Sequence, residues 1–144
     1  MAEFNPSKQL SGTWGQVWVE DEELAEIKEF QAKIDVTKED IRRAGDMATY
    51  TKATGYKGKG SLKLSKVYTR FYDMFEDIDE GINRTFSLIV KLSDPNSDGE
   101  ERWKLTGCQF DDFTFGNFNV GKLTEEDHPF TFAKAKKMDS IDLV

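Results

Sequence analysis

Cys108 and His128 are the one cysteine and the one histidine of the chain, and a thiol and an imidazole can act together as nucleophile and base. Cys108 falls inside a segment that we expect to form a strand, where a buried thiol behaves as a small apolar residue. His128 precedes Pro129 in an acidic loop. We therefore expect no catalytic pair, and a single cysteine also excludes an intrachain disulfide.

Two short motifs share residues with ligand sites but lack the rest of the chemistry. The segment Asp94–Gly99 matches the opening of a calcium-binding EF-hand loop, but the twelfth loop position, which must supply a bidentate Glu, is Leu105. A polar hairpin turn is the better interpretation. Gly55, Gly58 and Gly60 resemble a phosphate-binding loop, but no Gly-Lys-Ser/Thr follows them, which favours a flexible or closely packed loop. The sequence predicts no catalytic residue, no metal site and no cofactor.

Charge and length set the next bounds. The 144 residues are expected to form a single domain, residues 1–144. The net charge of −7 opposes binding to nucleic acid. Residues 46–70 contain six basic residues against Asp46 alone, a net charge of +5, so the remainder carries −12. This basic strip suits either phosphates or an acidic face of an identical subunit.

The longest aliphatic run, residues 88–90, is far short of the ~20 apolar residues of a membrane span, so we expect no membrane insertion.

The elements that must position these residues are mostly strands. Alternation of apolar and polar side chains predicts strands over residues 13–20, 30–36, 61–68, 86–92 and 102–110. Phe71, Met74, Phe75 and Ile78 instead follow helical spacing, so a helix is expected over residues 69–80, with Gly81 at its C-terminal cap. The sequence therefore predicts a mainly β fold, an antiparallel β-sandwich or barrel with one flanking α-helix.

Two segments are expected to lack regular structure. Residues 1–12 are interpreted as a flexible N-terminal arm. Residues 37–60 are expected to form a long extended loop, in which Thr37–Asp40 resembles the start of a short helix and the glycines interrupt regular structure. Loops of this length inside a compact domain are usually functional or disordered.

Several stretches resemble one protein family. The opening Ser-Gly-Thr-Trp-Gly-Gln-Val-Trp-Val at residues 11–19 and the segment 25–33 resemble the start of the tail tube proteins of contractile, PBSX-type phage tails and R-type bacteriocins. The stretch Lys-Ala-Thr-Gly-Tyr-Lys-Gly-Lys-Gly-Ser-Leu-Lys-Leu at residues 52–64 is similar to a loop and strand of that family, and its glycine-lysine part is the most specific match. Glu101–Trp103, Phe110–Asp112 and Pro129–Phe132 also fit, so the resemblance covers most of residues 11–132.

The resemblance implies a structural role without catalysis. Subunits of this family would form hexameric rings that stack into a hollow tube inside a contractile sheath, for DNA passage or for puncture of a cell envelope. The implied partners are other copies of the chain, tail sheath proteins and baseplate proteins, with DNA only as transiting cargo in a phage. Assembly in the bacterial cytoplasm would be followed by incorporation into a phage tail or a released bacteriocin particle.

The resemblance also suggests where the chain contacts its neighbours. The long loop would reach a neighbouring subunit or ring, so we expect Lys52, Lys57 and Lys59 at such an interface. The polar side of the second strand, Gln31, Lys33 and Asp35, is expected to face the lumen, with an outer solvent-facing surface as the alternative.

A binding protein is the alternative class. A monomeric β-barrel could enclose a small apolar ligand among the 11 phenylalanines of the chain. Aromatic side chains more often fill a core than line a ligand site. Such a monomer would not form filaments, and its lysine-rich loop would have no partner.

Overall fold

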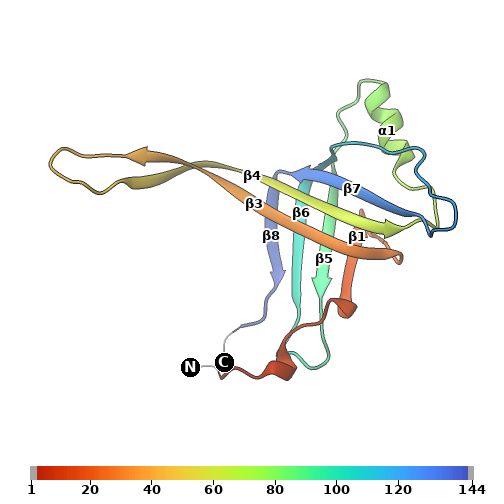
Figure 1. Ribbon diagram of the computed structural model, residues 1–144, viewed down its shortest axis with the longest axis horizontal. Coiled ribbons are helices and arrows are strands. Elements are labelled where there is room, and N and C mark those ends of the chain that lie inside the picture. The colour runs from red at the N-terminus through yellow and green to blue at the C-terminus, as the bar shows by residue number, and fades with distance from the viewer. Residues whose placement is uncertain (1–2, 143–144) are drawn as a thin grey trace.

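The computed structural model describes residues 3–142 and shows a β fold with one helix (Figure 1). Two 3₁₀ turns, η1 (Pro6–Lys8) and η2 (Gly12–Trp14), precede the strands. The larger elements are β1 (Gly15–Val19), β2 (Glu22–Glu23), β3 (Ile27–Ile41), β4 (Tyr50–Ser65), α1 (Tyr72–Asp79), β5 (Phe86–Leu92), β6 (Glu101–Phe110), β7 (Glu125–Phe132) and β8 (Lys134–Asp139). No helix among the described residues has the length and apolar character needed to cross a membrane.

All strand pairs are antiparallel, in the order β2-β1-β5-β6-β7-β4-β3, and β8 also pairs with β6. The sheet folds over so that β3, β4 and β7 run across β1, β5, β6 and β8 (Figure 1). Its two ends, β2 and β3, do not pair with each other. The prediction of a mainly β antiparallel fold with one helix is confirmed, and the sheet forms an open sandwich that does not close into a barrel.

The core lies between the two layers and follows the alternation of the strands. Leu62 and Leu64 of β4 and Leu88 of β5 are almost fully buried, as is Phe130 of β7. Burying one such side chain contributes about 1.5–3 kcal/mol relative to leaving it exposed. The phenylalanine rings pack against one another, with the Phe86 and Phe110 centroids 4.8 Å apart. Four phenylalanine side chains, Phe86, Phe110, Phe130 and Phe132, are buried in this core.

The chain changes layers at a corner after β7. Ala133 donates its backbone N–H to the Thr106 carbonyl at 2.9 Å, so β7 pairs with the end of β6 and β8 pairs with its beginning. Gly107 has a φ of 69°, and a Cβ there would lie 2.8 Å from the Ala133 Cβ. Glycine is required at this position because its backbone is left-handed and the corner is tightly packed.

The predicted long loop over residues 37–60 is instead mostly strand. Thr37–Asp40 continues β3 and does not start a helix, because this segment pairs with residues 51–55 of β4. One register shift, between Thr37 and Lys38, accommodates an extra residue of β4. Only residues 42–49 connect the two strands, and we call them the tip. The hairpin beyond its last pair with β7, residues 34–58, projects from the sandwich as an arm (Figure 1).

The helix agrees with the apolar spacing but is shorter than predicted. It begins after Phe71, whose φ of 67° turns the chain into α1, and it buries Met74 against the core. At its end Gly81 donates to the Ile78 carbonyl and Ile82 donates to the Asp77 carbonyl, which is the hydrogen-bond pattern of a Schellman motif. Gly81 has a φ of 83°, so the expected glycine cap is confirmed.

The N-terminal segment contacts the turn between β5 and β6, in contrast to the flexible arm predicted for residues 1–12. The Ser11 backbone N–H donates to the Asp94 carboxylate at 3.0 Å, and Lys8 pairs with Asp98 at 2.7 Å. These contacts hold the two 3₁₀ turns beside the sandwich. Residues 1 and 2 of the predicted arm lie outside the described residues.

Candidate assembly surfaces

Cys108 and His128, the two residues whose side chains could have acted as nucleophile and base, are buried. The Cys108 Sγ contacts the Leu105 carbonyl at 3.5 Å, and burial raises the pKa of its thiol to about 12. The His128 Nε2 lies 3.0 Å from a Glu126 carboxylate oxygen, and its ring stands edge-on to Phe71. The two residues therefore have different partners, and the thiol stays protonated at neutral pH.

The two motif fragments have structural roles. The Asp94 carboxylate is buried and accepts hydrogen bonds from the backbone N–H groups of Ser11 and Asn96, so this segment is a turn that anchors the N-terminal residues. Gly58 and Gly60 lie under two rings of β7. A Cβ on Gly58 would lie 2.5 Å from the Phe132 ring, and one on Gly60 would lie 2.5 Å from the Phe130 ring. Close packing explains these glycines. Within residues 3–142, no three His, Cys, Asp or Glu residues are grouped to hold a metal ion.

One side of the arm is apolar and uncovered. The side chains that continue the core-facing row of the hairpin are Ile34 and Val36 on β3 and Tyr56, directly opposite Val36, on β4. Their exposed fractions are 41%, 51% and 54%. A cavity of about 490 Å³ opens between the base of this row and the inner face of β5, β6 and β8, where Trp103 and Val90 line it. Contiguous exposed apolar surface of this kind marks an interaction site.

The other side of the arm and its base carries all six residues singled out from the sequence, and we call it the lysine face. In the strand register Lys57 lies opposite Asp35, Lys59 opposite Lys33, and Ser61 opposite Gln31. Beyond the bulge Lys52 lies opposite Glu39 on the same face. Like charges directly opposite each other destabilise a strand pair, so the Lys33 and Lys59 pair favours an acidic partner from outside the subunit. The structure thus brings the predicted interface and lumen residues together on one surface.

The outer edge of β3 is a third uncovered feature. β3 is 15 residues long and ends the sheet, so one row of its backbone N–H and C=O groups faces away from the subunit. A long edge strand is a template for pairing with another chain unless something covers it. The sequence did not indicate this edge, because the second half of β3 was assigned to the loop.

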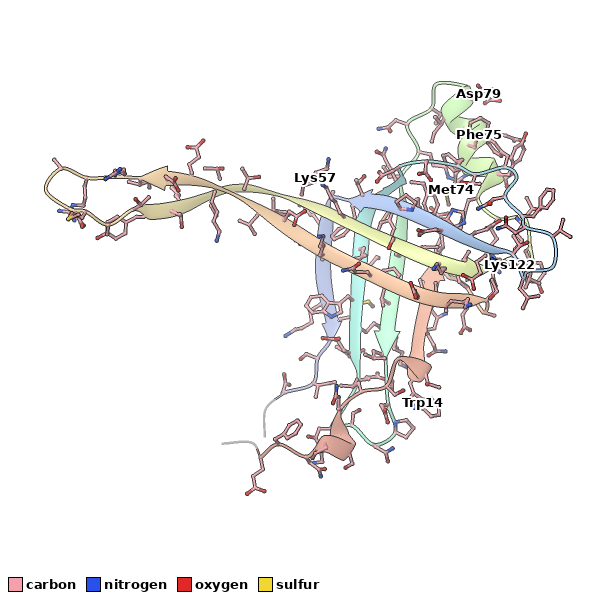
Figure 2. The ribbon with its side chains drawn as sticks, viewed as in Figure 1. Trp14, Lys57, Met74, Phe75, Asp79 and Lys122 are labelled. Carbon is pink, nitrogen blue, oxygen red and sulfur yellow. The ribbon has the colours of Figure 1, made fainter. Side chains whose placement is uncertain are left out.

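The end of the molecule opposite the tip is also apolar. Residues 111–124, which we call the aromatic loop, connect β6 to β7 and include Lys122, at the far end of the longest axis from the tip (Figure 2). Phe115 is anchored on Phe75 of α1, with centroids 4.9 Å apart. The loop nevertheless exposes four large apolar side chains, namely Phe115, Phe118, Val120 and Leu123.

A basic surface on the outer face of β5, β6 and β8 was missed by sequence reasoning. Lys91 lies opposite Arg102, and Lys104 lies opposite Lys136, so four basic side chains from three strands share this face. Lys134 is on the same face, opposite Thr106. Lys91 and Arg102 have acidic partners in Glu100 and Asp139. These residues are dispersed along the sequence, and only the strand register brings them together.

An open β-sandwich that projects a hairpin with uncovered apolar, basic and edge-strand surfaces is the architecture of a protein that assembles with other chains. A family model described as phage tail tube protein matches residues 2–139. The phage-like element PBSX protein XkdM of Bacillus subtilis is 32% identical over 126 residues, which are 85% of this chain and 86% of that protein. The uncharacterized protein YqbM of the same organism shows the same identity and coverage. The chain belongs to the phage tail tube protein family and is a structural subunit of a tail tube.

Solved structures show the same fold. The anti-feeding prophage cap, which terminates a tube, has a TM-score of 0.72 at 11% identity and covers 97% of this chain and 95% of its own. A chain of the extended sheath–tube complex of the PVC extracellular contractile injection system has a TM-score of 0.70 at 10% identity, with coverage of 96% and 100%. These likenesses extend over nearly all of the chain.

Proposed function

We propose that the subunit forms hexameric rings that stack into a hollow tube, through which DNA passes or with which a cell envelope is punctured. The observation that carries this proposal is the arm, because its two faces and its edge are left uncovered by the part of the subunit that the structure describes. An arm that contacts a different surface of the next copy makes a heterologous interface. Such an interface closes into a ring or propagates into a filament.

The lysine face is the proposed contact with a neighbouring subunit or ring. Lys52, Lys57 and Lys59 have no ion pair within the described residues, although acidic side chains lie opposite two of them. A −12 remainder of the chain supplies the complementary charge. Because Lys33 and Asp35 share this face, we propose the same interface for them. Lumen exposure of Gln31, Lys33 and Asp35 is the alternative that mutation of this face tests.

The partners of such a tube follow from its place in a contractile particle. The PVC neighbour is part of a sheath–tube complex, and another neighbour belongs to the anti-feeding prophage baseplate. We propose that the tube formed by this chain contacts a sheath along its outer wall and a baseplate at one end. Assembly would take place in the bacterial cytoplasm, and the product would be part of a phage tail or of a released tail-like particle.

Electron microscopy of the purified protein over a range of concentrations, with light scattering alongside, tests this proposal. Six-fold rings or stacked tubes are the expected result, because the uncovered surfaces are then satisfied by other copies. A strict monomer that retains a small apolar molecule through purification would overturn it in favour of the ligand-binding class. Rings with another symmetry would contradict the hexamer while retaining the tube.

A further inference from the structure

We propose that the tip of the arm docks on the aromatic loop of a neighbouring copy, with Met47 inserted beside Phe115 and Phe118. This inference rests on the proposed tube and names the two surfaces that meet in it. It is carried by the construction of the tip, by the cavity on the aromatic loop and by the charges on both.

The tip holds an apolar side chain in solvent by means of an ordered turn. The Asp46 carboxylate accepts a hydrogen bond from the Ala48 N–H at 2.9 Å and another from the Tyr50 hydroxyl at 2.6 Å. The hydrogen bond from Tyr50 lowers the pKa of the Asp46 carboxyl most, and the hydrogen bond from Ala48 lowers it further. Both favour the charged carboxylate. Gly45, with a φ of 80°, reverses the chain before it. Met47 extends from this turn with 96% of its surface exposed.

The aromatic loop offers a cavity suited to such a side chain. The cavity has a volume of about 310 Å³ and is lined by Phe115 and Phe118, with Glu125, Glu126 and Asp127 beside them. Phe118 is 77% exposed, so its ring is left largely uncovered by residues 3–142. A methionine thioether packs well in irregular apolar gaps and makes favourable contacts with aromatic rings. Glu125 is already paired with Lys28 and Glu126 with Lys66, so Asp127 is the carboxylate of this lining that would meet the guanidinium groups that precede Met47 in the tip.

The charges of the two surfaces are opposite in sign. The tip, residues 42–49, carries Arg42 and Arg43 against Asp46, a net charge of +1. The aromatic loop, residues 111–124, carries Asp111 and Asp112 against Lys122, a net charge of −1, and Asp127 of β7 lies beside it. Within the described residues, neither Arg42 and Arg43 of the tip nor Asp111 and Asp112 of the aromatic loop form an ion pair. Complementary charge of this kind fixes the partner and the register of an interface.

The two surfaces cannot meet within one subunit, because they lie at opposite ends of its longest axis (Figure 1). Each copy therefore donates its tip to one neighbour and accepts the tip of another on its aromatic loop. This contact is heterologous, and repeated contacts connect the subunits of an assembly without using the same surface twice.

Disulfide cross-linking in assembled tubes tests the contact. Subunits carrying Met47→Cys are mixed with subunits carrying Phe118→Cys, assembled, oxidised and run on a non-reducing gel. A cross-linked dimer is expected from this mixture, and a ladder is expected from the Met47→Cys/Phe118→Cys double variant. The buried Cys108, with its raised pKa, does not compete. Lys134→Cys, exposed on β8, is the control partner for Met47→Cys.

Tubes that form normally but cross-link Met47→Cys only to the control position would overturn the docking and leave the tube proposal intact. A preparation without rings or tubes at any concentration would contradict the proposed function itself.

Charge exchange supplies a second measurement that needs no cysteine. Arg42→Glu/Arg43→Glu should lose assembly, and mixing it with Asp111→Lys/Asp112→Lys subunits should restore mixed assemblies. Failure to restore them, with both variants folded, would overturn the docking.

Discussion

Glycine is used in the arm for packing, and the structure separates glycines that are required from those that are not. Gly60 lies where the backbone of β4 passes between the Phe130 ring and the Gln31 carbonyl. Gly55, five residues earlier on the same strand, has no atom within 4 Å of where its Cβ would be. Neither residue has a positive φ, so any difference between their alanine variants reports packing alone.

Gly60→Ala should lower the free energy of unfolding by about 1–3 kcal/mol, because its new Cβ would lie 2.4 Å from the Gln31 carbonyl oxygen. Gly55→Ala should change the same quantity by no more than about 0.5 kcal/mol. Urea denaturation of the two variants and the parent protein provides the comparison. Equal losses in the two variants would show that the tight contact at Gly60 is relieved by a small movement.

The buried thiol of Cys108 makes the free energy of unfolding depend on pH in alkaline solution. Its pKa is about 12 in the folded state against an ordinary 9.0, so the folded state retains a proton that the unfolded state loses. Cys108 therefore contributes a stability that is complete below pH 9.0 and is lost as the pH rises towards 12. The free energy of unfolding should fall less steeply over this range in Cys108→Ala than in the parent. Parallel pH profiles would contradict this assignment.

At the scale of elements, the β3–β4 hairpin uses one alternation of apolar and polar side chains both to form part of the core and to present an exposed surface. Its half near the sandwich buries Leu62 and Leu64, whereas its outer half presents Ile34 and Val36 on one side and lysines on the other. The same residue pattern forms a core strand where β7 pairs beside it and the crossing layer lies over it, and an uncovered surface beyond the end of β7. The arm is therefore an extension of the sheet, which holds its lysines at fixed spacing.

Reversing the charges of the lysine face should impair assembly without unfolding the subunit. Lys52→Glu/Lys57→Glu/Lys59→Glu is expected to give shorter or fewer tubes by electron microscopy, with an unchanged circular dichroism spectrum, because these side chains make no contact in the core. Lys104→Glu/Lys134→Glu/Lys136→Glu applies the same charge change to the outer face of β6 and β8 and serves as the matched control. Tubes of parental length from the first variant would remove the lysine face from the interface.

The sequence anticipated most elements and missed the arm for a definite reason. Alternation located the inner half of the hairpin, and helical spacing located α1, because packing in the core imposes those periods. Every residue of β3 after Phe30 is exposed, and the apolar alternation ends at Val36. Thr37–Asp40 therefore shows no apolar period, and its capping residues favoured a helix. The lysines and the Gln31–Asp35 residues were recognised separately, and only the register showed that they share a face. No local signal could report the contacts of residues 8–11 with the turn at Asp94.

At the scale of the whole molecule, the charge distribution makes assembly sensitive to salt. The tip, with a net charge of +1, and the aromatic loop, with a net charge of −1, attract each other over distances that the Debye length limits to about 10 Å at 0.1 M ionic strength. The critical concentration for assembly, measured by light scattering, should rise as sodium chloride is increased. It should rise less in Arg42→Gln/Arg43→Gln, which has less charge to screen. Identical salt dependence of variant and parent would assign the effect to other charges.

The corner at Ala133 has a mechanical consequence. β6 is one continuous strand that belongs to both layers, and β7 and β8 leave it in different directions from a single glycine-packed bend. A push on the arm passes through β4 and β7 to β6 by backbone hydrogen bonds, and from there into the crossing layer by the covalent chain. The force is therefore transmitted by backbone hydrogen bonds and covalent bonds, without relying on contacts between side chains. We therefore expect a wall built from such subunits to resist shear between its two layers.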